Sequence, residues 1–161
     1  MGARTRLTTR GRLVVVGLAA VVLLGAVVLV RGLFTEDLLV RPEDPCDRPP
    51  MRTFRGVTLQ PAALAAFRGA QRATGGAIEV VQSYRSCGEQ ARACRNICGD
   101  PSGCPDLCAP PGLSYHQLGA AIDITQASLD TPGVIEALAE AGWCQSVPDS
   151  DPGHFSFDGC H

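Results

Sequence analysis

The sequence predicts a small α+β domain in which helices flank an antiparallel sheet, stabilised by disulfide bonds and preceded by one transmembrane helix. Three observations support this fold class. A long apolar run lies near the N-terminus, all the cysteines follow it, and helical patterns are interleaved with short, non-adjacent strand patterns in the remainder. At 161 residues the chain has room for one modest domain.

The transmembrane helix is predicted over residues 13–34. Residues 13–30 carry no charged side chain, and as a helix this run spans roughly 27 Å, close to the ~30 Å of a bilayer core. Leu33 and Phe34 extend the apolar length beyond Arg31, whose guanidinium can snorkel. The alternative is a cleaved signal peptide, but the apolar region of a signal peptide is usually only about 7–15 residues and needs a small-residue cleavage site.

Charge is divided unevenly on the two sides of this run. Residues 1–31 hold five of the fourteen arginines and no acid, whereas residues 32–161 hold the other nine arginines and all sixteen acidic residues. Because positive residues stay on the cytoplasmic side, residues 1–12 are predicted to be a cytoplasmic basic tail. The chain is therefore expected to be a single-pass protein of the cell membrane with an extracytoplasmic C-terminal domain. The acidity of that domain excludes nucleic-acid binding by charge.

The eight cysteines all lie in the predicted extracytoplasmic part. An even number in an exported domain indicates a disulfide framework. Roughly a hundred pairings are possible, and one of them, Cys46 with Cys160, would tie the two ends of the domain together. The alternative is a thiolate metal site, because the C-x-x-x-C segments at 94–98 and 104–108 have spacings that some zinc sites use. An oxidising location favours disulfides.

Residues 35–53 are rich in proline and charge and are expected to form an extended linker. The folded domain is expected over residues 54–161. Its first helix is predicted over residues 61–76, where Pro61 suits the first turn, apolar residues form a stripe and two glycines end the pattern. The alternating, β-branched residues 77–84 predict a strand.

A cysteine-rich insertion over residues 87–108 follows this strand. It begins with a short predicted helix over 88–98 and continues into the turn-rich residues 99–113, which only cross-links would hold in place. The remaining predicted elements are a strand over 119–125, a helix over 131–142 capped by Asp130 or Thr131, and a short strand over 154–158.

His116, Asp123 and His154 form a candidate metal centre. His116 enters one predicted strand from a loop, Asp123 lies within that strand, and His154 begins another. The small residues between His116 and Asp123 allow other groups to approach closely. Two imidazoles and one carboxylate are a donor set for catalytic Zn²⁺ that leaves a fourth position open to water. A single histidine is more often structural, so this hypothesis depends on the three side chains converging.

Two further side chains would complete a hydrolytic mechanism at such a centre. Zinc would activate a water molecule as nucleophile, and Asp151, three residues before His154, is the candidate to take its proton. Arg85, at the end of a predicted strand, is the candidate to stabilise the oxyanion. The sequence therefore predicts a zinc hydrolase with Asp151 and Arg85 as catalytic residues.

The segment SYHQLGAAIDI, residues 114–124, resembles the S-x-H-x-x-G-x-A-x-D signature of the zinc D-alanyl-D-alanine carboxypeptidases and dipeptidases of the VanY/VanX type. Upstream, VVQSYRS is similar to the strand of that family that ends in Y-R-S. Downstream, DPGHFSF is similar to the family's E-x-x-H segment. The resemblance covers roughly residues 55–158, with the three segments in the family's order.

The resemblance implies a fold, a cofactor and a substrate. The fold is a small α+β domain whose central antiparallel sheet holds Zn²⁺ through His116, Asp123 and His154. The substrate is the D-Ala-D-Ala end of peptidoglycan stem peptides, or a cross-link within them. A membrane anchor that faces the cell wall suits such a substrate, so the expected protein is a membrane-anchored extracytoplasmic zinc metallopeptidase.

The resemblance also implies that Arg85 contacts the scissile carbonyl and that Ser114 and Tyr84 shape the substrate site. Two positions depart from the family pattern. Asp151 stands where the family has a catalytic glutamate, and its carboxyl group sits roughly 1.5 Å further back, a displacement that can reduce a rate on the order of 100-fold. Gly153 replaces the usual tryptophan, which removes bulk beside the metal ligand.

Two other functions stay open from the sequence. The first is a cell-wall binding module that contains zinc but has weakened or no catalysis, because aspartate replaces the glutamate base. The second is a disulfide-rich interaction domain without metal. Metal content and hydrolysis of D-Ala-D-Ala-terminated peptides separate the three.

Overall fold

The computed structural model describes residues 39–104 and 107–159. The described elements, in chain order, are β1 (Arg52–Phe54), β2 (Val57–Leu59), α2 (Pro61–Ala73), β3 (Val80–Gln82), α3 (Cys87–Cys98), α4 (Tyr115–Leu118), β4 (Ala121–Ile124), α5 (Gln126–Leu129), α6 (Val134–Glu140), β5 (Trp143–Cys144) and β6 (His154–Phe157). The transmembrane helix predicted over 13–34 lies outside the described residues. Among the residues that are described, no helix combines the length and apolar character needed to cross a bilayer.

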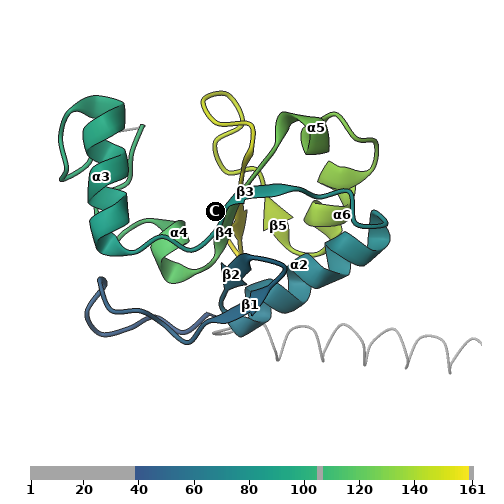
Figure 1. Ribbon diagram of the computed structural model, residues 1–161, viewed down its shortest axis with the longest axis horizontal. Helices are drawn as coiled ribbons and strands as arrows, with labels where there is room; N and C mark the ends of the chain where they lie inside the picture. Colours follow the sequence, from purple (N-terminus) through teal and green to yellow (C-terminus); the bar gives the residue numbers. More distant parts are fainter. Residues whose placement is uncertain (1–38, 105–106, 160–161) are drawn as a thin grey trace, which may run out of the picture. The chain divides into compact units, whose positions relative to one another are not determined.

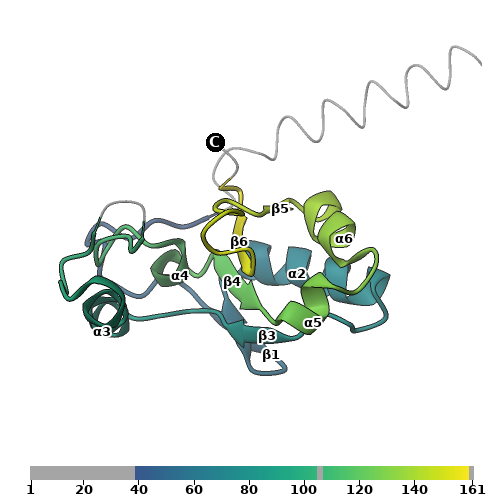
Figure 2. The ribbon, with the colours of Figure 1, turned by 90° about the horizontal axis from the view of Figure 1, so that it is seen from above.

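The central element is a sheet of four strands in the order β3-β4-β6-β5, in which every neighbouring pair is antiparallel. Figures 1 and 2 show this sheet between two groups of helices, with α2, α5 and α6 on one side and α3 and α4 on the other. A second, two-stranded sheet is formed by β1 and β2. The arrangement confirms the α+β class with antiparallel sheets and helices.

The alternation of side chains along β4 and β6 assigns one face of the sheet to the core. Ile122 and Ile124 of β4 and Phe155 and Phe157 of β6 all belong to the main apolar cluster. Because neighbouring residues of a strand point to opposite faces, the residues between them face the side of α3 and α4. These two strands therefore have one apolar face and one polar face.

Helices α2 and α6 cover the apolar face. In α2 the buried residues recur at helical spacing, and they are Ala63, Leu64, Phe67 and Ala70. This helix confirms the element predicted over residues 61–76. Helix α6 contributes Val134 and Leu138 to the same cluster. It begins later than predicted, because Gly133, with its left-handed backbone, occupies the N-cap in place of Asp130 or Thr131.

The hairpin of β1 and β2 was not predicted. Its turn is made by Arg55 and Gly56, both with positive φ, as a two-residue hairpin turn of the primed type requires. The preceding chain also contacts the domain, since the backbone of Val40 donates to and accepts from the Gln60 side-chain amide at 2.7 and 2.9 Å. Leu39 also belongs to the main apolar cluster, so residues before the expected boundary at 54 pack on the domain.

Disulfide bonds confirm the main interpretation of the cysteines. The bonds join Cys46 to Cys87, Cys94 to Cys108 and Cys98 to Cys104, and Cys144 is also disulfide-bonded. The pairing of Cys46 with Cys160 is wrong, because Cys46 bonds to the first residue of α3 instead. The thiolate metal site is wrong as well, since the two C-x-x-x-C segments are cross-linked to each other.

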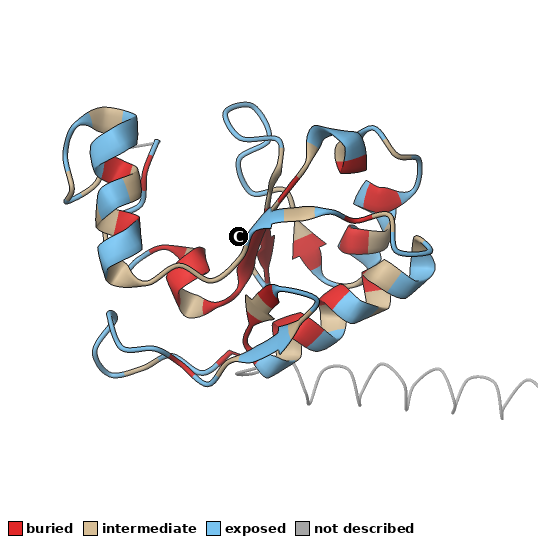
Figure 3. Ribbon diagram, viewed as in Figure 1, coloured by how far each residue is buried: buried red, intermediate tan, exposed pale blue. Residues whose placement is uncertain are grey.

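Helix α3 lies apart from the apolar core. Figure 3 shows it largely exposed, with buried positions confined to the side that faces the irregular residues after it. Its buried residues are Gln90 and Cys94, and neither belongs to the main apolar cluster. The cysteine-rich insertion is therefore held mainly by cross-links.

Candidate metal centre

The register of β4 and β6 places two of the predicted ligands directly opposite each other. Asp123 pairs with His154 across the antiparallel ladder, and both lie on the polar face of the sheet. In such a ladder the Cβ atoms of opposite residues are about 4.5–5.5 Å apart, so short side chains on one face meet. The His154 Nδ1 atom lies 2.9 Å from Asp123 Oδ1.

The third predicted ligand, His116, lies on α4 rather than at the entry of a strand. The Ser114 hydroxyl caps this single turn by accepting a hydrogen bond from the His116 backbone N–H at 3.3 Å. Gly119 ends the turn with φ of 68°, and its N–H donates to the His116 carbonyl at 3.1 Å. The serine and the glycine of the sequence signature thus start and stop the turn that aims His116 at the sheet.

The three side chains converge. His116 Nε2 lies 3.2 Å from Asp123 Oδ1 and 3.3 Å from His154 Nδ1. Ligand atoms about 2.0–2.1 Å from a tetrahedral zinc ion are roughly 3.3 Å apart, so these separations suit zinc. This is the one group of metal-binding side chains found within the described part of the chain.

The hydrogen bonds behind the ligands fix which nitrogen faces the cluster. His116 Nδ1 lies 2.6 Å from the Ser83 carbonyl oxygen, which can only accept, so the ring proton sits on Nδ1. A neutral His116 then directs the Nε2 lone pair at the Asp123 carboxylate. His154 Nε2 lies 3.2 Å from the Ser156 hydroxyl on the far side of its ring. Such outer contacts orient metal-binding histidines.

Two ring nitrogens and a carboxylate oxygen at these separations can share one bound cation. Burial of Asp123 raises its pKa, but the neighbouring His116 and His154 rings outweigh burial and hold that pKa well below the ordinary value. The carboxylate is thus ionised and faces two imidazoles whose side chains are 4 and 16 % exposed. The donor set, its spacing and its buried charge fit a divalent metal such as zinc.

Arg85 lies beside this cluster. Its Nη2 atom is 3.8 Å from Asp123 Oδ2, and its two terminal nitrogens donate to Gln82 Oε1 at 2.7 Å and Gln90 Oε1 at 2.9 Å. Burial lowers the pKa of the guanidinium, and the negative charge of Asp123 opposes that shift. The buried Nε atom has no hydrogen-bond partner within the described residues. A cation held in place beside the metal-binding side chains is suited to bind an oxygen that gains negative charge.

A cavity of about 780 Å³ opens onto the three ligands. Arg85, Ser114 and Asp151 also line it, so the structure brings these predicted residues together. The insertion contributes apolar wall residues, among them Ile97 and Leu107, which are 55 and 63 % exposed. The insertion therefore forms one wall of the cleft.

Tyr84 lies elsewhere. Arg48 stacks over its ring at 5.0 Å, and Tyr84 does not line the cavity. Tyr115, the first residue of α4, does line it. The substrate-binding role of Tyr84 stays a prediction that the geometry does not favour.

Gly153 has a packing role that the sequence did not indicate. A Cβ atom at this position would lie 2.9 Å from the Ile124 carbonyl oxygen. The Gly153 carbonyl in turn accepts a hydrogen bond from the Ile124 N–H at 3.0 Å. The glycine therefore allows the chain to run close along β4 just before His154.

Several supporting residues were missed from the sequence. Ser156 lies two residues after His154 on a strand, so the period of two would have placed it on the same face. Gln82 ends β3 and Arg85 lies in the irregular segment after it, so no periodic pattern predicts their contact. The contact of His116 with Ser83 uses a backbone carbonyl, for which the sequence holds no signal.

Comparison with known proteins places the chain in a family. The model of the VanY D-alanyl-D-alanine carboxypeptidases matches residues 58–148, which include Arg85, His116 and Asp123 and end before Asp151. A search of curated proteins found no match.

Two solved structures share the fold. The first is a zinc complex of a mutant vancomycin-resistance D,D-pentapeptidase VanY from a VanB-type resistance cassette, with a TM-score of 0.55 and 20% identity over 76% of this chain and 88% of that one. The second is VanYB in complex with D-alanine-D-alanine, with a TM-score of 0.52 and 21% identity over 71% of this chain and 79% of that one. At these identities the likeness is one of fold. Since the family model covers more than half of its length, the chain belongs to the VanY family of D-alanyl-D-alanine carboxypeptidases, which are zinc peptidases.

Proposed function

We propose that this chain is a zinc-dependent carboxypeptidase that hydrolyses D-Ala-D-Ala-terminated stem peptides of peptidoglycan. The observation that carries the proposal is the convergence of His116, Asp123 and His154 on one point at the floor of a cavity that Arg85 and Asp151 also line. The solved structures support the choice of metal and substrate, since one is a complex with Zn(II) and another is a complex with D-Ala-D-Ala.

In this proposal the metal is held by His116 Nε2, Asp123 Oδ1 and His154 Nδ1. Zinc with such ligands supplies a nucleophile at neutral pH and polarises a carbonyl group. The Ser83 carbonyl and the Ser156 hydroxyl keep the two imidazoles in the required orientation.

Arg85 binds the oxygen of the scissile carbonyl. Its guanidinium is fixed by two glutamine side chains and has a buried donor without a partner among the described residues. Charge that develops on the carbonyl oxygen in the transition state therefore meets a guanidinium that is already held in place. The nearby carboxylate of Asp123 keeps the local charge balanced.

Asp151 takes the proton of the attacking nucleophile and passes it to the leaving amine. Asp151 lies in the turn before β6, and its backbone carbonyl accepts a hydrogen bond from the His154 N–H at 3.1 Å. The carboxylate is therefore carried by the same short turn that leads to the metal ligand His154. The family resemblance implies that Ser114 and Tyr84 are substrate-site residues, and both roles are part of this proposal. Ser114 has a buried position on the cavity wall.

One observation favours a second candidate, a zinc-containing cell-wall binding module with weakened or lost hydrolysis. Asp151 is exposed, and its side chain is one methylene shorter than the family's glutamate. A base that stands too far back by about 1 Å can reduce the rate on the order of 100-fold.

The test uses the zinc-loaded chain with D-Ala-D-Ala-terminated pentapeptide, and release of D-alanine is measured. Asp151→Ala should abolish release, while Asp149→Ala, two residues away and outside the cavity lining, should retain it. If the wild type and Asp151→Ala are equally inert while Asp151→Glu gains activity, the binding module is the correct function. If zinc does not co-purify with the wild type at all, both candidates fail.

We also propose that the chain is anchored in the cell membrane by the apolar residues 13–34, with the catalytic domain outside the cytoplasm. The disulfide bonds support an oxidising compartment, which is also where peptidoglycan lies. Protease added to intact spheroplasts should digest the domain. Protection of the domain until the membrane is broken would contradict this orientation.

A further inference from the structure

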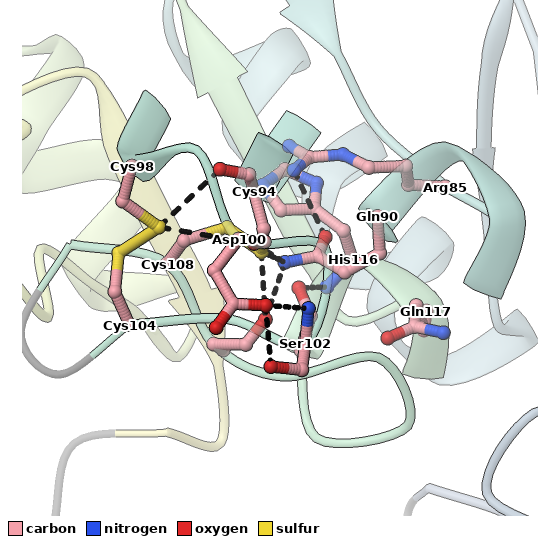
Figure 4. The surroundings of a disulfide bond; sticks show 12 residues. Arg85, Gln90, Cys94, Cys98, Asp100, Ser102, Cys104, Cys108, His116 and Gln117 are labelled. Atoms are coloured by element: carbon pink, nitrogen blue, oxygen red, sulfur yellow. Dashed lines mark hydrogen bonds between the residues drawn. A yellow bond between two sulfur atoms is a disulfide. The ribbon is translucent and has the colours of Figure 1, made fainter. Parts of the chain in front are cut away.

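Gln90 connects the proposed carbonyl-binding residue to the cysteine-rich insertion. It lies on α3 and is 2 % exposed. Figure 4 shows it between Arg85 and the disulfide of Cys94 and Cys108. A buried amide between a catalytic cation and a cross-link is a feature that the proposed mechanism does not use.

Both ends of the Gln90 amide have specific partners. Its oxygen accepts from Arg85 Nη1 at 2.9 Å, and its nitrogen donates to the Ala109 carbonyl at 2.7 Å. If the amide were flipped, its N–H groups would face a guanidinium that can only donate, and its oxygen would face a carbonyl that can only accept. The Ala109 carbonyl therefore selects the orientation in which the amide oxygen holds Arg85.

The Cys94–Cys108 bond fixes the Ala109 carbonyl. Ala109 directly follows Cys108, and Cys94 lies one helical turn beyond Gln90 on α3. The Gln90 nitrogen also lies 3.6 and 3.5 Å from the sulfur atoms of Cys94 and Cys108. The bond thus clamps the accepting carbonyl to the helix that carries the donor.

We propose that Gln90 and the Cys94–Cys108 disulfide act together as a positioning device for Arg85. The inference rests on the proposed function for the role of Arg85 in catalysis. The disulfide holds Ala109, Ala109 orients Gln90, and Gln90 holds the guanidinium beside Asp123. Residues 99–113 are turn-rich, and the other cross-link of the insertion, Cys98–Cys104, joins them to α3 five residues before Ala109, so the Cys94–Cys108 bond is the one next to the carbonyl.

The test compares four variants of the full-length, zinc-loaded chain with the wild type. Gln90→Met keeps the volume and loses both hydrogen bonds. Gln90→Glu keeps an acceptor for Arg85 and loses the donor for Ala109. A paired Cys94→Ala/Cys108→Ala variant removes the disulfide, and a paired Cys98→Ala/Cys104→Ala variant removes the neighbouring disulfide of the same insertion as a matched control.

The first readout is hydrolysis of the D-Ala-D-Ala-terminated pentapeptide. Gln90→Met and the Cys94/Cys108 variant should each lower kcat by about tenfold to 100-fold, with zinc affinity unchanged. Combining them should give no further loss, because both changes remove the same restraint. Gln90→Glu should recover part of the loss, and its activity should be insensitive to removal of the Cys94–Cys108 bond.

The second readout is the NMR signal of the Arg85 guanidinium in chains labelled with ¹⁵N-arginine. Rotation of the terminal nitrogens should be slow in the wild type and in the Cys98/Cys104 control, and fast in Gln90→Met and in the Cys94/Cys108 variant. Equal effects of both disulfide pairs, or additive losses with Gln90→Met, would overturn the inference. If the wild type hydrolyses nothing, the proposed function fails, while the NMR comparison still decides whether Arg85 is positioned in this way.

Discussion

Ser156 is the residue beside the metal centre whose contribution is simplest to isolate. Its hydroxyl lies 3.2 Å from His154 Nε2 and also 3.2 Å from the Ser146 hydroxyl. Loss of an outer contact of a ligating histidine typically weakens metal affinity about 10- to 100-fold. Ser156→Ala should therefore weaken zinc binding by that factor in competition with a chromophoric chelator. Ser146→Ala, which leaves the contact of Ser156 with His154 in place, should have a much smaller effect; equal effects would contradict the assignment.

Gly153 gives a second prediction for a single residue. In Gly153→Ala the new methyl group would lie 2.9 Å from the Ile124 carbonyl oxygen, so the chain that leads to His154 must move. Forcing an extra methyl group into packed structure typically costs about 1–3 kcal/mol. Both unfolding free energy and zinc affinity should fall. The control is Gly69→Ala, where a Cβ meets nothing within 4 Å in the interior of α2, and which should stabilise the chain by roughly 0.5–1 kcal/mol.

At the level of residues, the ligands were predictable and their supports were not. His116, Asp123 and His154 carry donor atoms of a known metal set, so their chemistry was visible in the sequence. What holds them in place is a backbone carbonyl at Ser83 and a glycine defined by its distance from Ile124, neither of which has a chemical signature. The structure was needed to find them because they act through position alone.

Among the elements, α3 depends on its first turn. The Ser86 hydroxyl accepts from the Glu89 N–H, and the Glu89 carboxylate accepts from the Ser86 N–H at 2.8 Å and from its hydroxyl at 2.7 Å. These hydrogen bonds hold the pKa of Glu89 below its ordinary value. The first turn carries Gln90, so fraying here also loosens the contact of Gln90 with Arg85.

The protonation of Glu89 should be visible as a pH-dependent loss of helix stability. Because its folded-state pKa is lowered, its contribution is present above the unfolded pKa and is lost as pH falls through the folded value. Amide hydrogen exchange in α3 should accelerate, relative to the intrinsic rate, as pH falls below about 4.3. Glu89→Gln should remove this pH dependence, and Ser86→Ala should weaken the helix by about 1 kcal/mol at neutral pH. An unchanged pH profile in Glu89→Gln would rule out the capping carboxylate as the cause.

Several of the elements that the sequence predicted correctly have a repeated pattern. Helix α2 has an apolar stripe over several turns, and β4 and β6 alternate clearly. The hairpin of β1 and β2 was missed because its turn uses Arg55 and Gly56 rather than the usual asparagine and glycine. Helix α4 was missed because a single turn is too short to show a period.

On the scale of the whole domain, the main apolar cluster lies apart from three of the disulfide bonds, which are those of the insertion. The main apolar cluster is built from the sheet, α2 and α6 and includes no cysteine. The insertion buries Cys94 and Cys108 outside that cluster and is cross-linked within itself and to Cys46. Two of the metal-binding residues, Asp123 and His154, lie on strands of the sheet that belongs to the apolar cluster.

Reduction of the disulfides should therefore loosen the two parts to different degrees. The apolar cluster keeps its buried area when the cross-links open, and burial of each large side chain contributes about 1.5–3 kcal/mol. Residues 87–113 have little apolar burial to replace their cross-links. Hydrogen exchange followed by mass spectrometry, with and without a phosphine reductant, should show loss of protection over residues 87–113 while α2, α6, β4 and β6 stay protected. The zinc affinity should fall only modestly, because Asp123 and His154 lie on the protected strands and His116 reaches them from α4, which follows the insertion. Joint loss of protection in both parts would mean that the cross-links hold the whole domain together, and that the sheet does not form a core of its own.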